Sequence, residues 1–280
     1  MRRTLNRAAL ALATALSLIA FSGCTTADKP KPTPPDYSQV PQTIAVIGDY
    51  GVGDKNEAAV ARMVNRFSPS ITLTVGDNRY KKAGYERLVG RYYKQDLIAA
   101  TGNHDYLMGI GAFDDFFGQS PSSRTFTYEA ESEVDFFILD SEAGMRSKAV
   151  REDQKAWLIK ALANSARTFK VVILHHPPYS SGKHSSTKRY QWDYAAMGAD
   201  LIISGHDHTY ERMVRHSATY IVDGTGGAKL YKCKNPPVYG SKICLDKYFG
   251  ALFLYVNDSQ LRGVFRTSAG VVLDSFTLSK

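Results

Sequence analysis

The chain has 280 residues, a formal net charge of +8 and 44% hydrophobic residues. This length and composition allow one α/β domain with a large core. The lysines and arginines are scattered and form no basic run, so we expect no nucleic-acid partner, and the mild positive charge suits anionic substrates or surfaces instead.

Residues 1–23 have the layout of an export signal, with a basic start, an apolar stretch from Ala8 to Phe21 and small residues before Cys24. The apolar stretch is shorter than the about 20 residues that span a bilayer. The sequence "FSGC" resembles a bacterial lipobox, which implies that Cys24 carries a lipid anchor. We therefore expect an exported protein, periplasmic or at the cell surface and anchored to a membrane. The alternative is that Cys24 leaves with a discarded peptide.

Residues 24–42 are rich in proline and have no apolar face to bury, which predicts an extended tether before a folded domain at 43–280. Two further cysteines, Cys233 and Cys244, lie in a segment with the prolines and glycine of a loop. Two cysteines this close in sequence favour a disulfide in an oxidising compartment. Two free thiols are the less favoured alternative.

From residue 43 onward, short apolar runs alternate with helical segments. "TIAVIGD" and "ITLTVGD" read as strands, and residues 54–67 between them have helical spacing with Asp54 as the cap. Residues 151–166 predict an amphipathic helix. The last runs, "ATYIVDG", "ALFLYVND", "LRGVFRT" and "VVLDSFTL", have no helices between them and indicate hairpins. The predicted fold class is α/β with packed sheets.

Several of these apolar runs end in side chains that bind metals. One Gly-Asp pair alone would as readily be a turn or a helix cap. In open α/β sheets, however, ligands bind beyond the carboxyl ends of the strands, so five such ends should converge on one rim. The residues concerned are Asp49, Asp77, Asn103, His104, His175, His206 and His208.

In chain order the motifs read "GDYG", "GDNRY", "GNHD", "LHH" and "GHDH". This ordered set resembles the calcineurin-like metallophosphoesterases. Tyr80, three residues after Asp77, resembles the Gly-Asp-x-x-Tyr element of purple acid phosphatases, and the chain is similar to their short, single-domain form. The resemblance implies a four-layer α/β/β/α sandwich of two packed mixed sheets flanked by helices. It also makes residues 43–280 the catalytic domain.

The resemblance implies a dinuclear metal centre, Fe(III) with a divalent Zn, Fe or Mn. Asp77 would bridge the two ions. Asp49, Tyr80 and His208 would complete the first site, and Asn103, His175 and His206 the second. Because alternate residues of an extended chain project to the same side, we expect His206 and His208 to lie on extended backbone and reach different ions.

The implied reaction is hydrolysis of a small phosphomonoester by direct attack of a metal-bound hydroxide. His104 and His184 would stabilise the phosphoryl group or protonate the leaving group, and Asp105 would orient His104 through a hydrogen bond. A phosphodiesterase or nucleotidase on the same scaffold is the alternative enzyme, and a surface binding lipoprotein with a decayed site is the alternative of another class. The sequence leaves the oligomeric state open.

Overall fold

The computed structural model describes residues 42–120, 122–130 and 133–280. The predicted export signal, Cys24 and nearly all of the predicted tether lie outside the described residues. The first strand begins at Gln42, one residue before the predicted start of the folded domain. No helix in the described part of the chain has the length and apolar character needed to cross a membrane.

The first sheet has six strands in the order β13-β12-β11-β1-β2-β3. Strands β1, β2 and β3 run parallel, and β11, β12 and β13 extend the sheet antiparallel from the other edge of β1, as predicted for hairpins of the last three runs. The run "ATYIVDG" does not join them, because residues 218–223 lie in the second sheet. The strands are β1 (Gln42–Ile47), β2 (Ile71–Thr74), β3 (Leu97–Ala99), β11 (Gly250–Val256), β12 (Gln260–Thr267) and β13 (Val272–Ser279).

The second sheet has seven strands in the order β10-β8-β9-β7-β6-β5-β4. Strands β5, β6, β7 and β9 run parallel, while β4, β8 and β10 pair antiparallel with their neighbours. The strands are β4 (Phe126–Glu129), β5 (Val134–Leu139), β6 (Phe169–Leu174), β7 (Leu201–Ser204), β8 (Tyr210–Arg215), β9 (Ala218–Asp223) and β10 (Ser241–Leu245).

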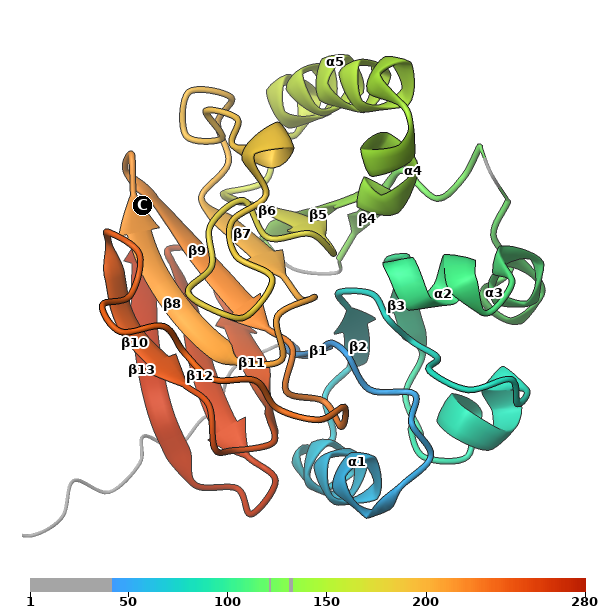
Figure 1. Cartoon of the computed structure of the whole chain (residues 1–280). Helices are drawn as coiled ribbons and strands as arrows, with labels where there is room; N and C mark the ends of the chain where they lie inside the picture. Colours follow the sequence, from blue (N-terminus) through green and yellow to red (C-terminus); the bar gives the residue numbers. More distant parts are fainter. Residues whose placement is uncertain (1–41, 121, 131–132) are drawn as a thin grey trace, which may run out of the picture. The chain divides into compact units, whose positions relative to one another are not determined.

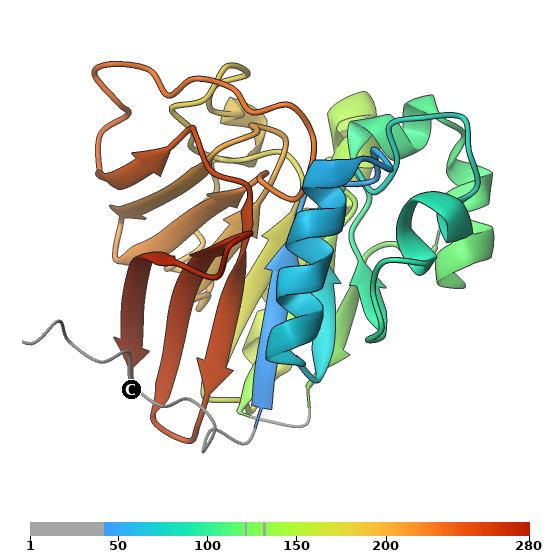
Figure 2. The ribbon, with the colours of Figure 1, turned by 90° about the horizontal axis from the view of Figure 1, so that it is seen from below.

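Helices cover the outer faces of both sheets (Figures 1 and 2). Helix α1 begins after Asp54, whose carboxylate accepts from the Asn56 and Glu57 amides, so the predicted cap is confirmed. Helix α5 starts earlier than predicted because Ser147 caps it at the Val150 amide, and it ends at Asn164 rather than Ala166. The helices are α1 (Lys55–Phe67), α2 (Asn103–Leu107), α3 (Ile110–Phe117), α4 (Ser141–Arg146) and α5 (Lys148–Asn164), with short helical turns at Glu86–Gly90 and Lys188–Tyr190.

Three apolar clusters hold the layers together. On β1, Ile44 and Val46 point into the core between the sheets, while Ala45 and Ile47 point into the cluster beneath α1. Strand β6 divides its residues in the same way between the central core and the cluster that includes residues of α5. The predicted fold, two packed mixed sheets flanked by helices, is therefore confirmed.

The predicted disulfide between Cys233 and Cys244 is also confirmed. It joins the segment after β9 to strand β10 and closes a loop that we call the disulfide loop, residues 233–244. Strand β10 pairs with β8, so this loop is attached to the second sheet.

Glu57 is a buried acid on α1, and the Gly53 amide donates to its carboxylate at 2.6 Å. Burial raises the pKa of Glu57 to about 7, although the Gly53 and Val52 amides act to lower it. The ordinary carboxyl pKa is about 4.3. Glu57 therefore stabilises the fold relative to the unfolded chain below about pH 4.3, and this contribution is lost as the pH rises through about 7.

We predict that Glu57→Gln removes this pH dependence. The difference in unfolding free energy between wild type and variant should fall by on the order of 3 kcal/mol between pH 4 and pH 8. Urea unfolding across this range measures it, with the exposed Glu152→Gln on α5 as the control. A difference that stays constant with pH would contradict the prediction.

Candidate metal centre

The candidate ligands follow five strand ends on the rim where the two sheets meet. Asp49 comes after β1, Asp77 after β2 and Asn103 after β3, all in the first sheet. His175 follows β6, and His206 and His208 follow β7, in the second sheet. The His206 amide donates to Asp49 Oδ2 at 2.9 Å, which ties the two sheets together at this rim.

Three of these residues have left-handed backbone, with φ of 54° at Asp49, 53° at Asp77 and 69° at His206. Non-glycine residues in this region carry strain, and such strain gathers at functional sites. The expectation that His206 and His208 lie on extended backbone is therefore wrong. The left-handed turn at His206, rather than strand alternation, directs the two imidazoles to different neighbours.

Glycines precede the ligands because the rim has no room for a larger side chain. A Cβ at Gly76, where φ is 96°, would lie 2.6 Å from His175 Nδ1. A Cβ at Gly205 would lie 2.5 Å from Asp49 Oδ2. Both distances are far below van der Waals contact, so the Gly-Asp and Gly-His pairs allow the two sheets to approach closely here.

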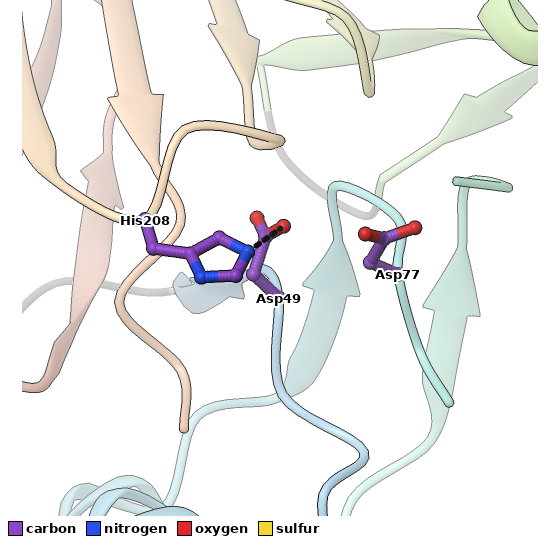
Figure 3. Close-up of side chains that lie close together, drawn as sticks. All are labelled: Asp49, Asp77 and His208. Atoms are coloured by element: carbon purple, nitrogen blue, oxygen red, sulfur yellow. Dashed lines mark ion pairs between the residues drawn. The ribbon is translucent and has the colours of Figure 1, made fainter. Parts of the chain in front are cut away.

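The first group of ligands surrounds the Tyr80 hydroxyl. Its oxygen lies 3.0 Å from Asp49 Oδ1, 2.9 Å from Asp77 Oδ2 and 3.0 Å from His208 Nε2. Figure 3 shows the Asp49, Asp77 and His208 side chains directed toward one space, with His208 Nε2 3.3 Å from Asp49 Oδ1. One ligand atom from each of these three residues falls within 4.8 Å of the others.

The second group surrounds the side-chain oxygen of Asn103. This atom lies 3.1 Å from His175 Nε2 and 2.9 Å from His206 Nδ1. His175 Nε2 is also 3.4 Å from Asp77 Oδ1. Since Asp77 Oδ2 contacts Tyr80, the Asp77 carboxylate joins the two groups, and this is the geometry expected of a bridging ligand.

Backbone carbonyls set the orientation of two of the histidines. His175 Nδ1 donates to the Val75 carbonyl at 2.9 Å, and His208 Nδ1 donates to the Lys229 carbonyl at 2.7 Å. In the neutral ring each Nε2 then presents a lone pair to the centre. Metal-binding histidines are commonly held through their second nitrogen in this way.

With neutral imidazoles, the two groups contain more acceptors than hydrogens. The Tyr80 hydroxyl has one hydrogen for the acceptors of Asp49, Asp77 and His208. When His175 loses its second ring proton, its Nε2 lone pair faces carboxylate and amide oxygens. Cations satisfy such convergent lone pairs, and carboxylate, phenol and imidazole are ordinary metal ligands. These residues therefore fit a pair of metal ions.

The protonation equilibria also reflect the crowded charge. Burial acts to lower the pKa of His175, but the Asp77 and Asp49 carboxylates outweigh it and raise the pKa to about 10. Burial acts to raise the pKa of Asp77, yet His175 and His104 hold it well below its usual range. Burial and the neighbouring His175 lower the pKa of His206, so this ring is neutral and its lone pair is available.

His104 lies against the first group. Its amide donates to Asp77 Oδ1 at 2.7 Å, and its ring centre lies 4.2 Å from that of Tyr80. Its Nδ1 atom is buried without a hydrogen-bond partner among the described residues. The expectation that Asp105 orients His104 is wrong. Asp105 accepts instead from the Asn78 side chain and amide, the Gly102 amide and the Tyr85 hydroxyl.

His184 lies against the second group. Its ring centre is 4.4 Å from that of His206, and the buried Asp207 carboxylate accepts from its amide at 2.7 Å. Partial burial lowers the pKa of His184, although Asp207 opposes this. His104 and His184 thus lie beside different ligand groups, His104 beside Tyr80 and His184 beside His206.

Two residues that support the centre were not found from the sequence. Asn78 is buried and donates from its side chain to the Ala100 carbonyl and Asp105, so it joins the ends of β2 and β3. Tyr231 stacks on His208 with ring centres 4.1 Å apart and planes 9° apart. Asn78 follows Asp77 directly, so its place in the motif was a signal for a supporting role. Nothing in the sequence around Tyr231 connects this residue with His208.

Residues 42–210, which contain every candidate ligand, match the family described as calcineurin-like phosphoesterase. The chain belongs to this family. Among curated relatives, Arabidopsis thaliana purple acid phosphatase 17 is 24% identical over 84% of this chain and 83% of its own length. Purple acid phosphatase 3 of the same plant is 24% identical over 92% of this chain and 83% of its own length.

Solved structures share the fold of this phosphoesterase. Purple acid phosphatase PPD1 from yellow lupin (Lupinus luteus) seeds has a TM-score of 0.68 and 20% identity, over 85% of this chain and 53% of that one. GAP50, described as the anchor in the inner membrane complex of Plasmodium, has a TM-score of 0.74 and 17% identity, over 85% of this chain and 88% of that one. These likenesses show the shared fold, while the family match identifies a metallophosphoesterase and the curated relatives show its similarity to purple acid phosphatases.

The geometry predicts how metal content responds to substitution. Asp77→Asn keeps the side-chain volume but removes the charge shared by both groups, so this phosphoesterase should lose most of both bound ions. His206→Ala changes only the second group and should cost about one ion per chain. Elemental analysis of the purified variants measures this, with exposed His216→Asn as the control. Full metal content in Asp77→Asn would contradict the bridging role.

Proposed function

We propose that this protein is a purple acid phosphatase-type phosphomonoesterase that hydrolyses small phosphomonoesters without a covalent intermediate on the protein. The observation that carries the proposal is the Tyr80 hydroxyl, which lies within 3.0 Å of atoms of Asp49, Asp77 and His208. A phenol oxygen at this position adds a hard ligand to the first group. The cysteines of the described residues form a disulfide, so neither supplies a nucleophilic thiolate.

The two ligand groups differ in chemistry, which supports a mixed metal pair. Asp49, Asp77 and Tyr80 give the first group mostly oxygen ligands, suited to Fe(III), while His175 and His206 make the second group richer in nitrogen, suited to divalent Zn, Fe or Mn. A relative named Fe(3+)-Zn(2+) purple acid phosphatase 12 is 28% identical over 68% of this chain and 48% of its own length. When bound, the ions would neutralise phosphoryl charge and lower the pKa of a coordinated water.

His104 and His184 would act on the substrate itself. Each lies beside one ligand group, so a phosphoryl group held between the groups would come within reach of both rings. An imidazole N–H can donate to a phosphoryl oxygen, and a protonated imidazole can give its proton to the departing alkoxide, so either ring is suited to these roles. Asp105 fixes the loop that carries His104 through the Gly102 amide rather than through the His104 ring.

We further propose that the protein is exported and anchored to a membrane through lipidated Cys24, in the periplasm or at the cell surface. The support is the layout of residues 1–23 and the "FSGC" sequence. The proline-rich residues 24–42 would then keep the catalytic domain clear of the membrane. No basic run supports a nucleic-acid partner.

The deciding experiment compares phosphate release from an aryl phosphomonoester and the matching diester by the iron- and zinc-loaded protein, from acidic to alkaline pH. A strong preference for the monoester at acidic pH is the expected result. Preference for the diester, or activity only with manganese at alkaline pH, would overturn the proposal and favour a phosphodiesterase on the same scaffold.

A spectroscopic prediction tests the first group separately. Phenolate bound to ferric iron absorbs visible light, so the iron-loaded protein should be coloured and Tyr80→Phe should lose the band while keeping the fold. The exposed Tyr239→Phe serves as the control. A band of undiminished intensity in Tyr80→Phe would show that the tyrosine does not bind the iron.

A further inference from the structure

Lysines gather on two segments that border the metal centre on the side of His184. Lys183 precedes His184 in the loop after β6, and residues 229–234 contribute Lys229, Lys232 and Lys234 from the segment after β9. These lysines are exposed. Neither the export signal nor the ligand set accounts for them.

Lys183 is held close to the metal centre through an aromatic ring. Its ammonium lies over the Tyr231 ring, 4.8 Å from the ring centre, which is a cation–π contact. The Tyr231 ring stacks on that of His208 at 4.1 Å. Adding these two distances puts the ammonium no farther than about 9 Å from the centre of the His208 ring. This is about one screening length at 0.1 M salt, so the ammonium charge still acts at the His208 ring.

The two segments are joined by hydrogen bonds, so the lysines are not independent of the site. The Tyr231 amide donates to the His208 carbonyl at 3.0 Å, and the Lys234 amide donates to the Ser181 carbonyl at 2.8 Å. The Lys234 ammonium donates to the Ser185 hydroxyl. These contacts place Lys183 and Lys234 beside the loop that carries His184, and the disulfide closes the loop that begins next to Lys234.

These charges are only partly neutralised. Lys232 pairs with Asp246 at 3.6 Å. Within residues 42–120, 122–130 and 133–280, the ion pairs include none for Lys183 or Lys234. Unneutralised ammonium groups at the rim of a binding site raise the local concentration of anions and favour anionic groups on a ligand.

We propose that Lys183, supported by Lys234, binds a second anionic group on the leaving-group side of the substrate. This inference rests on the proposed phosphatase function and narrows it to substrates whose leaving group is itself phosphorylated. Inorganic diphosphate is the simplest. The water oxygen bonds to one phosphorus atom, and the bond from that phosphorus to the bridging oxygen breaks. The second phosphate leaves with the bridging oxygen, and the protons of the water pass to the two phosphates that form. Lysine serves here as a point charge for phosphate.

The test compares kcat/KM for inorganic diphosphate and for phenyl phosphate in the full-length, metal-loaded protein. In Lys183→Gln the ratio of diphosphate to phenyl phosphate should fall about fivefold, since a partly exposed charge pair contributes modestly. Lys183→Arg keeps the charge and should retain most of the wild-type ratio. Lys160→Gln, an exposed lysine on α5, is the matched control and should leave the ratio unchanged.

The outcomes separate this inference from the proposed function. If the wild type hydrolyses phenyl phosphate but Lys183→Gln has the wild-type ratio, or the Lys160→Gln ratio falls equally, the inference is overturned while the phosphatase stands. If the wild type releases phosphate from neither substrate, the proposed function fails, and the inference fails with it. Added salt should lower diphosphate hydrolysis more in wild type than in Lys183→Gln, because it screens the exposed charge.

Discussion

The candidate metal centre depends on the Asp77 carboxylate, which contacts both groups of candidate ligands at the rim where the two sheets meet. Asp77 Oδ2 faces Tyr80 of the first group, and Asp77 Oδ1 faces His175 of the second. Convergent carboxylates and lone pairs repel one another unless cations lie among them. The surrounding fold holds the ligands in this arrangement, so the binding energy of an ion need not be used to assemble them.

The fold holds the ligands through backbone as much as through side chains. Left-handed residues at Asp49, Asp77 and His206 cost conformational energy, which the packed core between the sheets compensates. The Val75 and Lys229 carbonyls orient His175 and His208. Val75 directly follows β2 of the first sheet, so His175 is anchored across the two sheets, whereas Lys229 follows β9 and anchors His208 within the second sheet.

The two histidines beside the ligand groups have different neighbours. His104 packs on Tyr80, whereas His184 lies beside Tyr231, which contacts Lys183, and precedes Ser185, which accepts from Lys234. The proposed selection among phosphorylated substrates depends on these two lysines.

Local patterns in the sequence predicted the strands, the cap of α1, the favoured disulfide pair and the motifs that lead to the family, because these signals are local in the chain. Tertiary structure alone decided the partners of Asp105, the left-handed turn at His206 and the stack of Tyr231 on His208. Each depends on atoms from distant segments that meet only after the sheets pack. Short-range patterns report how a segment folds, whereas such contacts depend on how two folded segments approach each other in space.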